Sequence, residues 1–280
     1  MSKIWFVTGA SRGLGRQFVE AALSRGDKVA AAARSTGGFA ELSATYGDAL
    51  LPVEVDVTDK EAVFKGVTRA VEHFGRLDVV VNNAGYAQIG AIEELSEKDL
   101  RDQLETNVFG ALWVIQAALP HLRAQGSGHI VQLSSAAGLM AMPLGGAYHV
   151  SKWGVEALNE SLAQEVAEFG VKVTIVEPAG FATRDGKNPD PLANGHLAEL
   201  NPAYDGLRRR LGEAMRDQPA GDPAAAAQAL LKLIDAENPP LRVLFGLGFH
   251  PMLRKVYADR LRTWDDWQEL SAEAQGKPDA

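Results

Sequence analysis

Short runs of apolar, largely β-branched residues alternate with longer amphipathic stretches along most of this chain. A short apolar run is typical of a strand buried on both faces, and an apolar stripe at helical spacing is typical of a surface helix. The apolar runs predict six strands, at about residues 4–8, 28–33, 50–55, 77–82, 129–134 and 171–178. The amphipathic stretches predict helices at about residues 14–24, 39–46, 60–74, 98–122, 148–169 and 223–235, with Asp222 as the N-cap of the last.

Strands separated by helices of this length indicate βαβ units, a parallel sheet and right-handed crossovers. The predicted fold class is therefore α/β: a doubly wound parallel β-sheet with helices on both faces, in a single domain. We expect residues 1–249 to form this domain. Residues 250–280 are expected to extend it as a C-terminal helix docked through Trp264 and Trp267.

One region breaks the alternation. Residues 184–206 are rich in proline, glycine and asparagine, which favours an irregular loop. We predict that this loop is a lid over the substrate and the main source of substrate choice, together with the tail after Phe249. A static surface excursion is the alternative.

Composition excludes several classes of function. The net charge of −8 provides no basic field for nucleic acid or an anionic membrane, and we expect the run Arg208–Arg210 to be a solvated helix face. There is no cysteine, and the histidines lack zinc-site spacing, so we predict no metal. No apolar run reaches the ~18 residues of a membrane span, and no signal peptide is recognisable. We expect a cytoplasmic protein with no nucleic-acid or membrane partner.

The first strand runs directly into the segment TGASRGLG, residues 8–15, and then into a helix. Glycines at positions 9, 13 and 15 allow a sharp turn and a close backbone approach to a pyrophosphate at a helix N-terminus. This context predicts a dinucleotide site, although a tight turn whose small residues serve helix–sheet packing would need the same glycines.

The end of the second strand indicates which dinucleotide binds. Folds that prefer NAD usually carry an acid there for the ribose 2′-hydroxyl. This chain has Ala33 and then Arg34, with no acid until Glu41, and Arg12 lies within the glycine-rich turn. Two guanidinium groups suit a 2′-phosphate, so we expect NADP(H) to be favoured over NAD(H).

Tyr148 and Lys152 are four residues apart in a predicted helix, which places both on one face. A neighbouring cation favours the phenolate and would lower the tyrosine pKa from its ordinary value of about 10. The pair could therefore donate and accept a proton near neutral pH.

These pieces, in this order, resemble the short-chain dehydrogenase/reductase family in its compact single-domain branch. The resemblance covers about residues 3–183 and rests on TGASRGLG, DVTD, NNAG, ETNVFG, SSAAG, YHVSK and EPAGFAT. It implies a Rossmann-type fold and a catalytic set of Asn107, Ser135, Tyr148 and Lys152. It also implies that cofactor contacts come from Gly9, Ser11, Arg12, Gly13, Leu14, Gly15, Arg34, Asp56, Val57, Asn83, Ala84, Gly85, Tyr148, Lys152, Pro178, Gly180 and Thr183. In one departure from the family, Ala179 separates Pro178 from Gly180.

In this family Tyr148 would be the general acid/base, Ser135 would stabilise the substrate oxygen, and Asn107 would hold a relay water. The resemblance implies an NADP(H)-dependent oxidoreductase that interconverts a carbonyl and an alcohol. The apolar stretch after Ser135 favours a hydrophobic ketone or secondary alcohol. A non-catalytic NADP(H)-binding sensor is the alternative, and a sugar epimerase or dehydratase is a weaker one. Family members commonly form homodimers or homotetramers through helices equivalent to residues 98–122 and 148–169, so we expect the same here.

Overall fold

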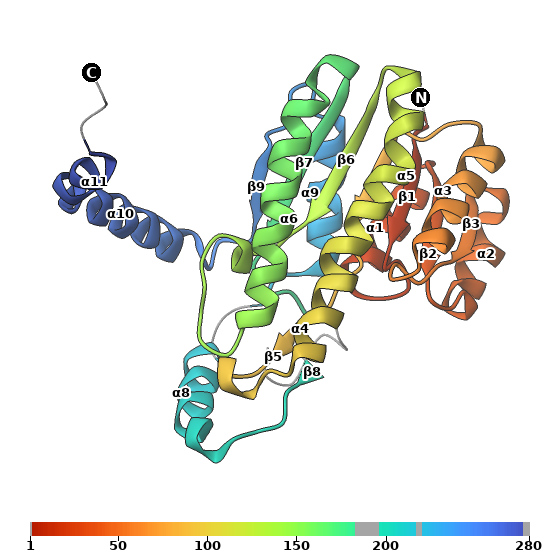
Figure 1. Cartoon of the computed structure of the whole chain (residues 1–280). Helices are drawn as coiled ribbons and strands as arrows, with labels where there is room; N and C mark the ends of the chain where they lie inside the picture. The colour runs from red at the N-terminus through yellow and green to blue at the C-terminus, as the bar shows by residue number, and fades with distance from the viewer. Residues whose placement is uncertain (1, 183–195, 217–219, 277–280) are drawn as a thin grey trace.

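The computed structural model describes residues 2–182, 196–216 and 220–276. In this part of the chain, seven parallel strands form one sheet in the order β3-β2-β1-β4-β6-β7-β9 (Figure 1). The strands are β1 (Ile4–Thr8), β2 (Lys28–Ala33), β3 (Leu50–Glu54), β4 (Val79–Asn82), β6 (Gly128–Leu133), β7 (Val171–Pro178) and β9 (Arg242–Phe245). A second, two-stranded parallel sheet pairs β5 (Gln88–Ile89) with β8 (His196–Leu197).

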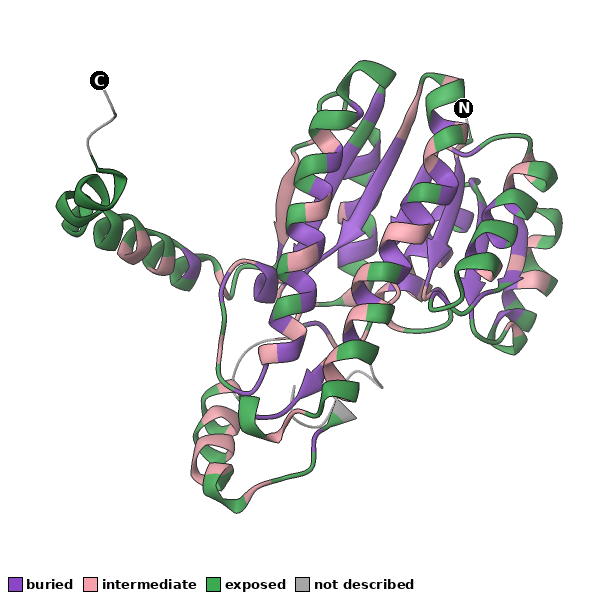
Figure 2. Cartoon of the chain, in the orientation of Figure 1, coloured by how far each residue is buried: buried purple, intermediate pink, exposed green. Residues whose placement is uncertain are grey.

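Helices cover both faces of the large sheet, and alternate strand residues belong to opposite faces. Trp5 and Val7 of β1 lie in one apolar cluster, whereas Ile4 and Phe6 lie in the other. The first cluster is covered by α1 (Gly13–Ser24), α2 (Ala40–Tyr46) and α9 (Pro223–Asp235). The second is covered by α3 (Lys60–Phe74), α5 (Gly110–Gln125) and α6 (Gly146–Glu165). This confirms the predicted doubly wound α/β fold (Figure 2).

The strand order indicates which end of the sheet carries the ligand site. β1 pairs with β2 on one side and with β4 on the other, so the crossovers leave β1 in opposite directions. In such sheets a crevice opens at the carboxyl ends of the strands where the order reverses. The loops after β1 and β4 therefore enclose the expected ligand site.

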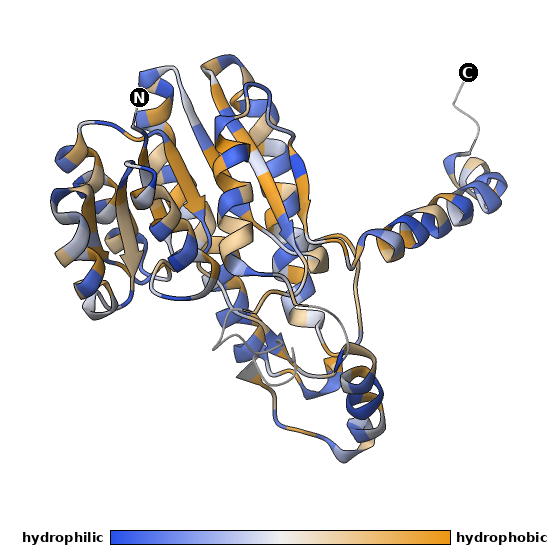
Figure 3. Ribbon diagram, turned by 180° about the vertical axis from the view of Figure 1, so that it is seen from behind, coloured by the Kyte–Doolittle hydropathy of each residue, from blue (hydrophilic) through white to orange (hydrophobic). Residues whose placement is uncertain are grey.

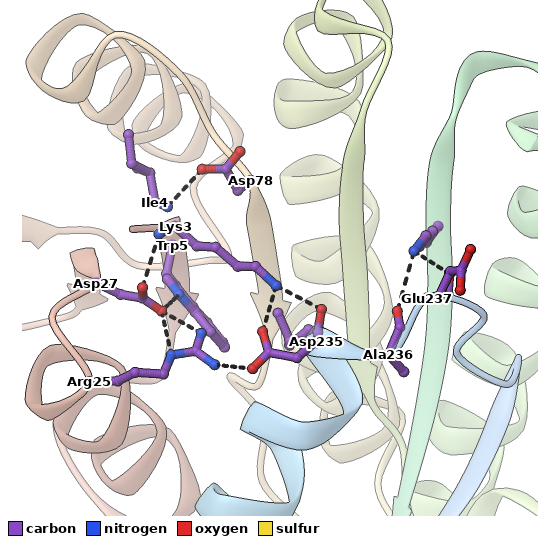
Figure 4. A network of polar contacts seen from close by, with 11 residues as sticks. Lys3, Ile4, Trp5, Arg25, Asp27, Asp78, Asp235, Ala236 and Glu237 are labelled. Atoms are coloured by element: carbon purple, nitrogen blue, oxygen red, sulfur yellow. Dashed lines mark hydrogen bonds and ion pairs between the residues drawn. The ribbon is translucent and has the colours of Figure 1, made fainter. Parts of the chain in front are cut away.

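The opposite, amino-terminal edge is held by a polar network (Figure 4). The buried carboxylate of Asp27 accepts hydrogen bonds from the Trp5 indole at 2.8 Å and from the Lys3 amide at 2.9 Å. Asp27 also pairs with Arg25, whose guanidinium reaches Asp235 at the end of α9. The network joins β1, the α1–β2 turn and α9, and so ties the first strand to a helix that forms more than 200 residues later in the chain.

The structure differs from the predicted elements in several places. Neither β5 nor β9 was predicted. The helix expected over residues 98–122 consists of α4 (Glu97–Leu104), a π-helical turn (Glu105–Phe109) and α5. The loop expected over residues 184–206 can be compared only in part: residues 184–195 lie outside the described residues, and residues 196–206 contain β8, a 3₁₀ turn (Pro202–Tyr204) and the start of α8 (Asp205–Arg216).

The prediction that Arg208 belongs to a solvated helix face is wrong. The Arg208 guanidinium donates to the buried carboxylate of Glu94 at 2.6 Å and to the main-chain oxygen of Asn201. Glu94 belongs to a short 3₁₀ turn after β5 (Ile92–Glu94). The ion pair thus attaches α8 to the small sheet.

The C-terminal segment is helical, as expected, but it is not docked. α10 (His250–Asp266) and α11 (Gln268–Gln275) project away from the body, with Trp264 and Trp267 exposed (Figures 1 and 2). Figure 3 shows hydrophilic and hydrophobic residues mixed along this projection, in contrast to the hydrophobic strands. Among the described helices, none combines the length and apolar character that crossing a bilayer would require.

Candidate active site

Two cavities lie at the carboxyl end of the sheet, on either side of the segment Tyr86–Ile89. Tyr86 and Gln88 line the first, and Ala87 and Ile89 line the second, because side chains in an extended segment alternate. The first cavity, of about 870 Å³, is lined mainly by polar groups near the ends of β1, β2 and β4. The second, of about 430 Å³, is lined mainly by apolar groups near the ends of β6 and β7.

The glycine-rich turn forms the base of the first cavity. Gly9 and Gly13 have φ values of 62° and 59°, a left-handed conformation that glycine adopts without strain. A Cβ on Gly15 would lie 2.4 Å from the main-chain oxygen of Gly9, so only glycine fits between the turn and Asn83. The turn is compact enough for its N–H groups and the start of α1 to meet a pyrophosphate, which supports the predicted dinucleotide site.

Hydrogen bonds from the loop after β4 hold this turn. The Asn83 side chain donates to the main-chain oxygens of Thr8 and Gly9 at 3.0 and 3.1 Å. The Thr8 hydroxyl accepts from the amides of Asn83 and Ala84. Thr8 is a site residue that the sequence analysis missed, because its role depends on contact between two loops 75 residues apart.

The predicted cofactor residues divide between the two cavities. The first is lined by Gly9, Ser11, Arg12, Arg34, Asp56, Val57, Asn83, Ala84 and Gly85, together with Ala33, Thr58 and Tyr86, which were not predicted. Pro178 and Gly180 line the second, with the intervening Ala179. Gly13 and Leu14 begin α1 behind the turn. Thr183 lies outside the described residues.

Arg12 and Arg34 are exposed at the mouth of the first cavity. No hydrogen bond or ion pair joins either guanidinium to another described residue, so both could accept an anionic ligand. Asp56 has a different local role: one of its carboxylate oxygens accepts from the amide and hydroxyl of Thr58.

Ser135 and Tyr148 meet in the second cavity. Ser135 follows β6 and caps a 3₁₀ turn (Ala136–Gly138), where its hydroxyl accepts from the amide of Ala137 at 3.1 Å. Tyr148 stands in the first turn of α6. The preceding serine, Ser134, is buried and does not line the cavity, so Ser135 is the serine that shares the cavity with Tyr148.

Lys152 lies one helical turn beyond Tyr148, as the spacing predicted. Its ammonium is 5.6 Å from the centre of the Tyr148 ring and donates to the main-chain oxygen of Leu133 at 2.8 Å. Burial lowers the pKa of Lys152 to about 8, and the nearby carboxylate of Glu156 acts in the opposite direction. Lys152 is therefore mostly protonated at neutral pH and loses its charge when the pH rises above about 8.

The pKa of Tyr148 differs from the expectation. Burial raises it, and a side-chain hydrogen bond with Ser135 lowers it, with a net rise above the ordinary value. The predicted lowering of this pKa is therefore wrong for the protein without ligands, because burial is the largest effect and raises it. A tyrosine in this state is a proton donor, and it becomes an effective base only when further positive charge approaches it.

Asn107 lies in the π-helical turn between α4 and α5 and is buried. Its amide group donates to the main-chain oxygen of Tyr86 and to the Ser151 hydroxyl, both at 2.9 Å, and its oxygen accepts from the Tyr86 amide at 3.1 Å. The side chain thus joins the loop after β4 to α6. A Cβ on Gly85 would lie 3.0 Å from the Asn107 oxygen, which explains the glycine there.

Two supporting residues escaped the sequence analysis. The His149 ring contacts the main-chain oxygen of Ala137 and accepts from the amide of Met142, both at 2.9 Å, and so fixes the turn that carries Ser135. Ser151 joins Asn107 to the main-chain oxygen of Tyr148. Both follow Tyr148 closely in the chain, but only the fold shows what they contact.

The remaining wall of the second cavity is apolar. The stretch after Ser135 contributes Ala136, Met142, Pro143 and Leu144, as expected from its composition. The opposite wall comes from late parts of the chain, with Leu211 and Met215 of α8 and Leu247 and Phe249 after β9. No group of three described histidine, aspartate or glutamate side chains is arranged to hold a metal ion.

The fold is a parallel sheet with a glycine-rich turn after β1, and a serine, a tyrosine and a lysine lie close together after β6. This combination is typical of α/β proteins that use a dinucleotide. Residues 3–190 match the short chain dehydrogenase family model. The chain therefore belongs to the short-chain dehydrogenase/reductase family and is an oxidoreductase of that family, as the sequence resemblance predicted.

Individual proteins agree with this assignment. Oxidoreductase BOA17 of Botryotinia fuckeliana is 40% identical, with 97% of this chain and 98% of that protein aligned. The crystal structure of a short-chain dehydrogenase from Streptomyces avermitilis is 38% identical, with a TM-score of 0.88 and 98% of each chain covered. ElxO with NADP bound is 25% identical, with a TM-score of 0.72 and 87% of this chain and 96% of that chain covered.

Proposed function

We propose that this protein is an NADP(H)-dependent oxidoreductase that reduces a carbonyl to an alcohol, or catalyses the reverse reaction, with Tyr148 as general acid/base. The observation that carries the proposal is the convergence of Ser135 and Tyr148 on one apolar cavity, with the Lys152 ammonium directly behind the phenol. A sensor that only binds the dinucleotide would need no such proton-transfer group.

The side chains divide the work as follows. When bound, NADP(H) supplies or takes the hydride. Ser135 donates a hydrogen bond to the substrate oxygen as negative charge builds on it. In reduction the Tyr148 hydroxyl gives its proton to that oxygen, which suits its raised pKa. In oxidation it takes the proton, and the Lys152 charge favours the phenolate that this requires.

In this proposal the Asn107 side chain holds neighbouring segments in place, and its main chain binds the relay water. Its side-chain amide is occupied by Tyr86 and Ser151. Asn107 lies in the π-helical turn Glu105–Phe109, where the main-chain bonding departs from the regular helical pattern, and we assign the relay water to its main-chain carbonyl. That carbonyl could hold the water that carries protons between Lys152 and solvent.

The proposed preference for NADP(H) rests on Arg12 and Arg34. Both border the polar cavity without a described ion-pair partner, and Ala33 stands where an acid would bind the ribose of NAD. A 2′-phosphate would accept charge-assisted hydrogen bonds from both guanidinium groups. The NADP bound to ElxO, a structural neighbour, is consistent with this choice.

The apolar cavity suits a hydrophobic ketone or secondary alcohol, because the described side chains that line it are apolar except for those of Ser135, Tyr148 and His149. The decisive experiment is to measure NADPH and NADH oxidation by the purified protein against a panel of ketones, steroids and acyl thioesters. Turnover of an apolar ketone with NADPH supports the proposal. NADPH binding without turnover of any carbonyl in the panel would favour the sensor instead.

We also propose self-association through the helices predicted at residues 98–122 and 148–169. Phe109 in the π-helical turn and Val150 and Trp153 on α6 are large apolar side chains exposed on these elements. A homodimer or homotetramer would cover them. The mass of the protein at micromolar concentration, measured by light scattering, tests this proposal, and a monomer would contradict it.

A further inference from the structure

The two C-terminal helices, residues 250–275, form what we call the C-terminal arm. Near its base, Leu253 is buried and the Arg260 guanidinium lies 5.0 Å from the Trp153 ring centre of α6. Beyond that point the body gives the arm no cover, since every residue from Leu261 to Gly276 is exposed. Figure 1 shows the arm extending away from the sheet and its helices.

The arm nevertheless carries large apolar side chains. Tyr257, Leu261 and Trp264 follow one another at intervals of four and three residues, which places them along one stripe of α10, and Trp267 follows three residues later at the junction with α11. Leu261, Trp264 and Trp267 are 58%, 67% and 60% exposed. Helices this short draw most of their stability from packing an apolar face, so the stripe implies a surface that covers it.

The charges of the arm indicate what that surface is. From His250 to Arg262 the arm carries Arg254, Lys255, Arg260 and Arg262 against the single acid Asp259. From Thr263 to Gln275 it carries four acids and no basic side chain: Asp265, Asp266, Glu269 and Glu273. The arm is therefore basic in its first half and acidic in its second. If two arms lie antiparallel, the basic half of each faces the acidic half of the other.

We propose that the arm pairs antiparallel with the arm of a second copy of this chain. Pairing about a two-fold axis near Leu261 would place the Leu261 side chains of the two copies together and Tyr257 against Trp264 of the second copy. Arg254 and Lys255 would then lie near the acidic half of the other arm, around Asp265 and Asp266. Such an isologous contact closes on itself and forms a dimer rather than a fibre.

A membrane surface is a poorer partner for the same stripe. Helices that lie in a bilayer interface are rich in lysine and arginine on the polar face, which attract anionic lipids. Here the half that carries Trp264 and Trp267 is the acidic half, so an anionic surface would repel it. Arm pairing does not depend on the oxidoreductase reaction, and it can be tested without a substrate.

The absence of cysteine from the chain allows a direct test. In Leu261→Cys, the only two thiols of a dimer would meet at the proposed axis, and mild oxidation should yield a covalent dimer on a non-reducing gel. Lys232→Cys, at an exposed position on α9, is the matched control and should stay largely monomeric. This readout reports arm pairing even if the bodies also associate through α5 and α6.

Charge reversal on the Leu261→Cys background tests the orientation. Arg254→Glu with Lys255→Glu should lower the cross-linking rate at least tenfold, and adding Asp265→Lys with Asp266→Lys should restore it. Arg209→Glu with Arg210→Glu, another adjacent exposed pair on α8, should change nothing. The proposal is overturned if Leu261→Cys does not cross-link, if the first reversal has no effect, or if the arm binds anionic phosphatidylserine vesicles while the thiols stay apart.

Discussion

The ammonium of Lys152 lies 5.6 Å from the centre of the Tyr148 ring and is anchored to the main-chain oxygen of Leu133. The anchor fixes the cation behind the phenol, while burial holds the lysine pKa at about 8. The pair therefore joins a tyrosine whose pKa is raised by burial to a lysine close to losing its charge. In the proposed reaction, the Lys152 charge and the bound substrate together determine whether the Tyr148 hydroxyl gives up its proton.

Removing that hydroxyl is the first test. Tyr148→Phe should fold normally and bind NADPH, but turnover should fall by about 10² or more, the scale of general acid–base catalysis. Steady-state kinetics and NADPH fluorescence titration measure the two effects separately. Tyr46→Phe is the matched control, because its hydroxyl forms a hydrogen bond with Ser24 and Tyr46 lines neither cavity. Turnover by Tyr148→Phe close to that of the control would contradict the mechanism.

The two arginines at the polar cavity give a second test. Arg34→Asp combined with Arg12→Ser should weaken NADPH binding and improve NADH binding relative to it, since each lost charge-assisted hydrogen bond is worth roughly 1.5–3 kcal/mol. The ratio of kcat/KM for the two cofactors measures the change. Arg69→Asp, on α3, controls for net charge. An unchanged ratio would show that the 2′-phosphate binds elsewhere.

The ion pair between Arg208 and Glu94 gives a third test. Arg208→Met should free α8, which carries Leu211 and Met215 of the apolar cavity, and leave the buried carboxylate of Glu94 without its cation. We expect a lower melting temperature and a KM for bulky ketones raised several-fold, with NADPH affinity unchanged. Arg209→Met, at the exposed neighbouring position, should alter neither. A loss of NADPH affinity equal to the change in KM would contradict this division of the site.

His129 should make the fold sensitive to acid. Burial is the main reason that its pKa falls to about 4, and the charges of Lys172 and Lys3 contribute. Between about pH 6.5 and 4 the unfolded chain binds a proton that the folded chain does not, so stability must fall as the pH falls. The expected loss across this window is roughly 3 kcal/mol.

Urea unfolding at several pH values measures this dependence. His129→Gln, which retains a polar group near Thr174, should show a shallower decline between pH 6.5 and 4 than the wild type. His73→Gln, at an exposed position on α3, should keep the wild-type slope. Equal slopes for all three proteins would mean that His129 titrates normally.

Local patterns were sufficient to predict most of the fold. The apolar run Ile4–Thr8 is buried at every position, and Pro223–Asp235 forms a helix capped by Asp222, as expected. The strand Arg242–Phe245 was missed because it has four residues, begins with arginine and follows two prolines, so its apolar character is too brief to separate from a loop. It becomes a strand because β7 offers an edge on which it can pair.

The site was predictable where spacing along one element fixes geometry. Tyr148 and Lys152 are an example, since four residues of helix bring them together. Thr8 with Asn83, and Arg208 with Glu94, join segments 75 and 114 residues apart, and no local pattern indicates such pairs. The prediction that Trp264 and Trp267 dock the C-terminal helix was wrong for a related reason. An apolar stripe shows that a helix needs a partner, but not where that partner is.

The polar network around Asp27 lies at the edge of the sheet opposite to both cavities. Natural selection can therefore vary the cavity walls without disturbing the residues that hold β1, α1 and α9 together. The walls of the apolar cavity also come largely from the later part of the chain, after Ser135, whereas most of the polar cavity is built by the part before it. Under the proposed function, a lineage could thus acquire new substrates by exchanging the segments around α8 and the β9–α10 junction, while inheriting the polar cavity unchanged.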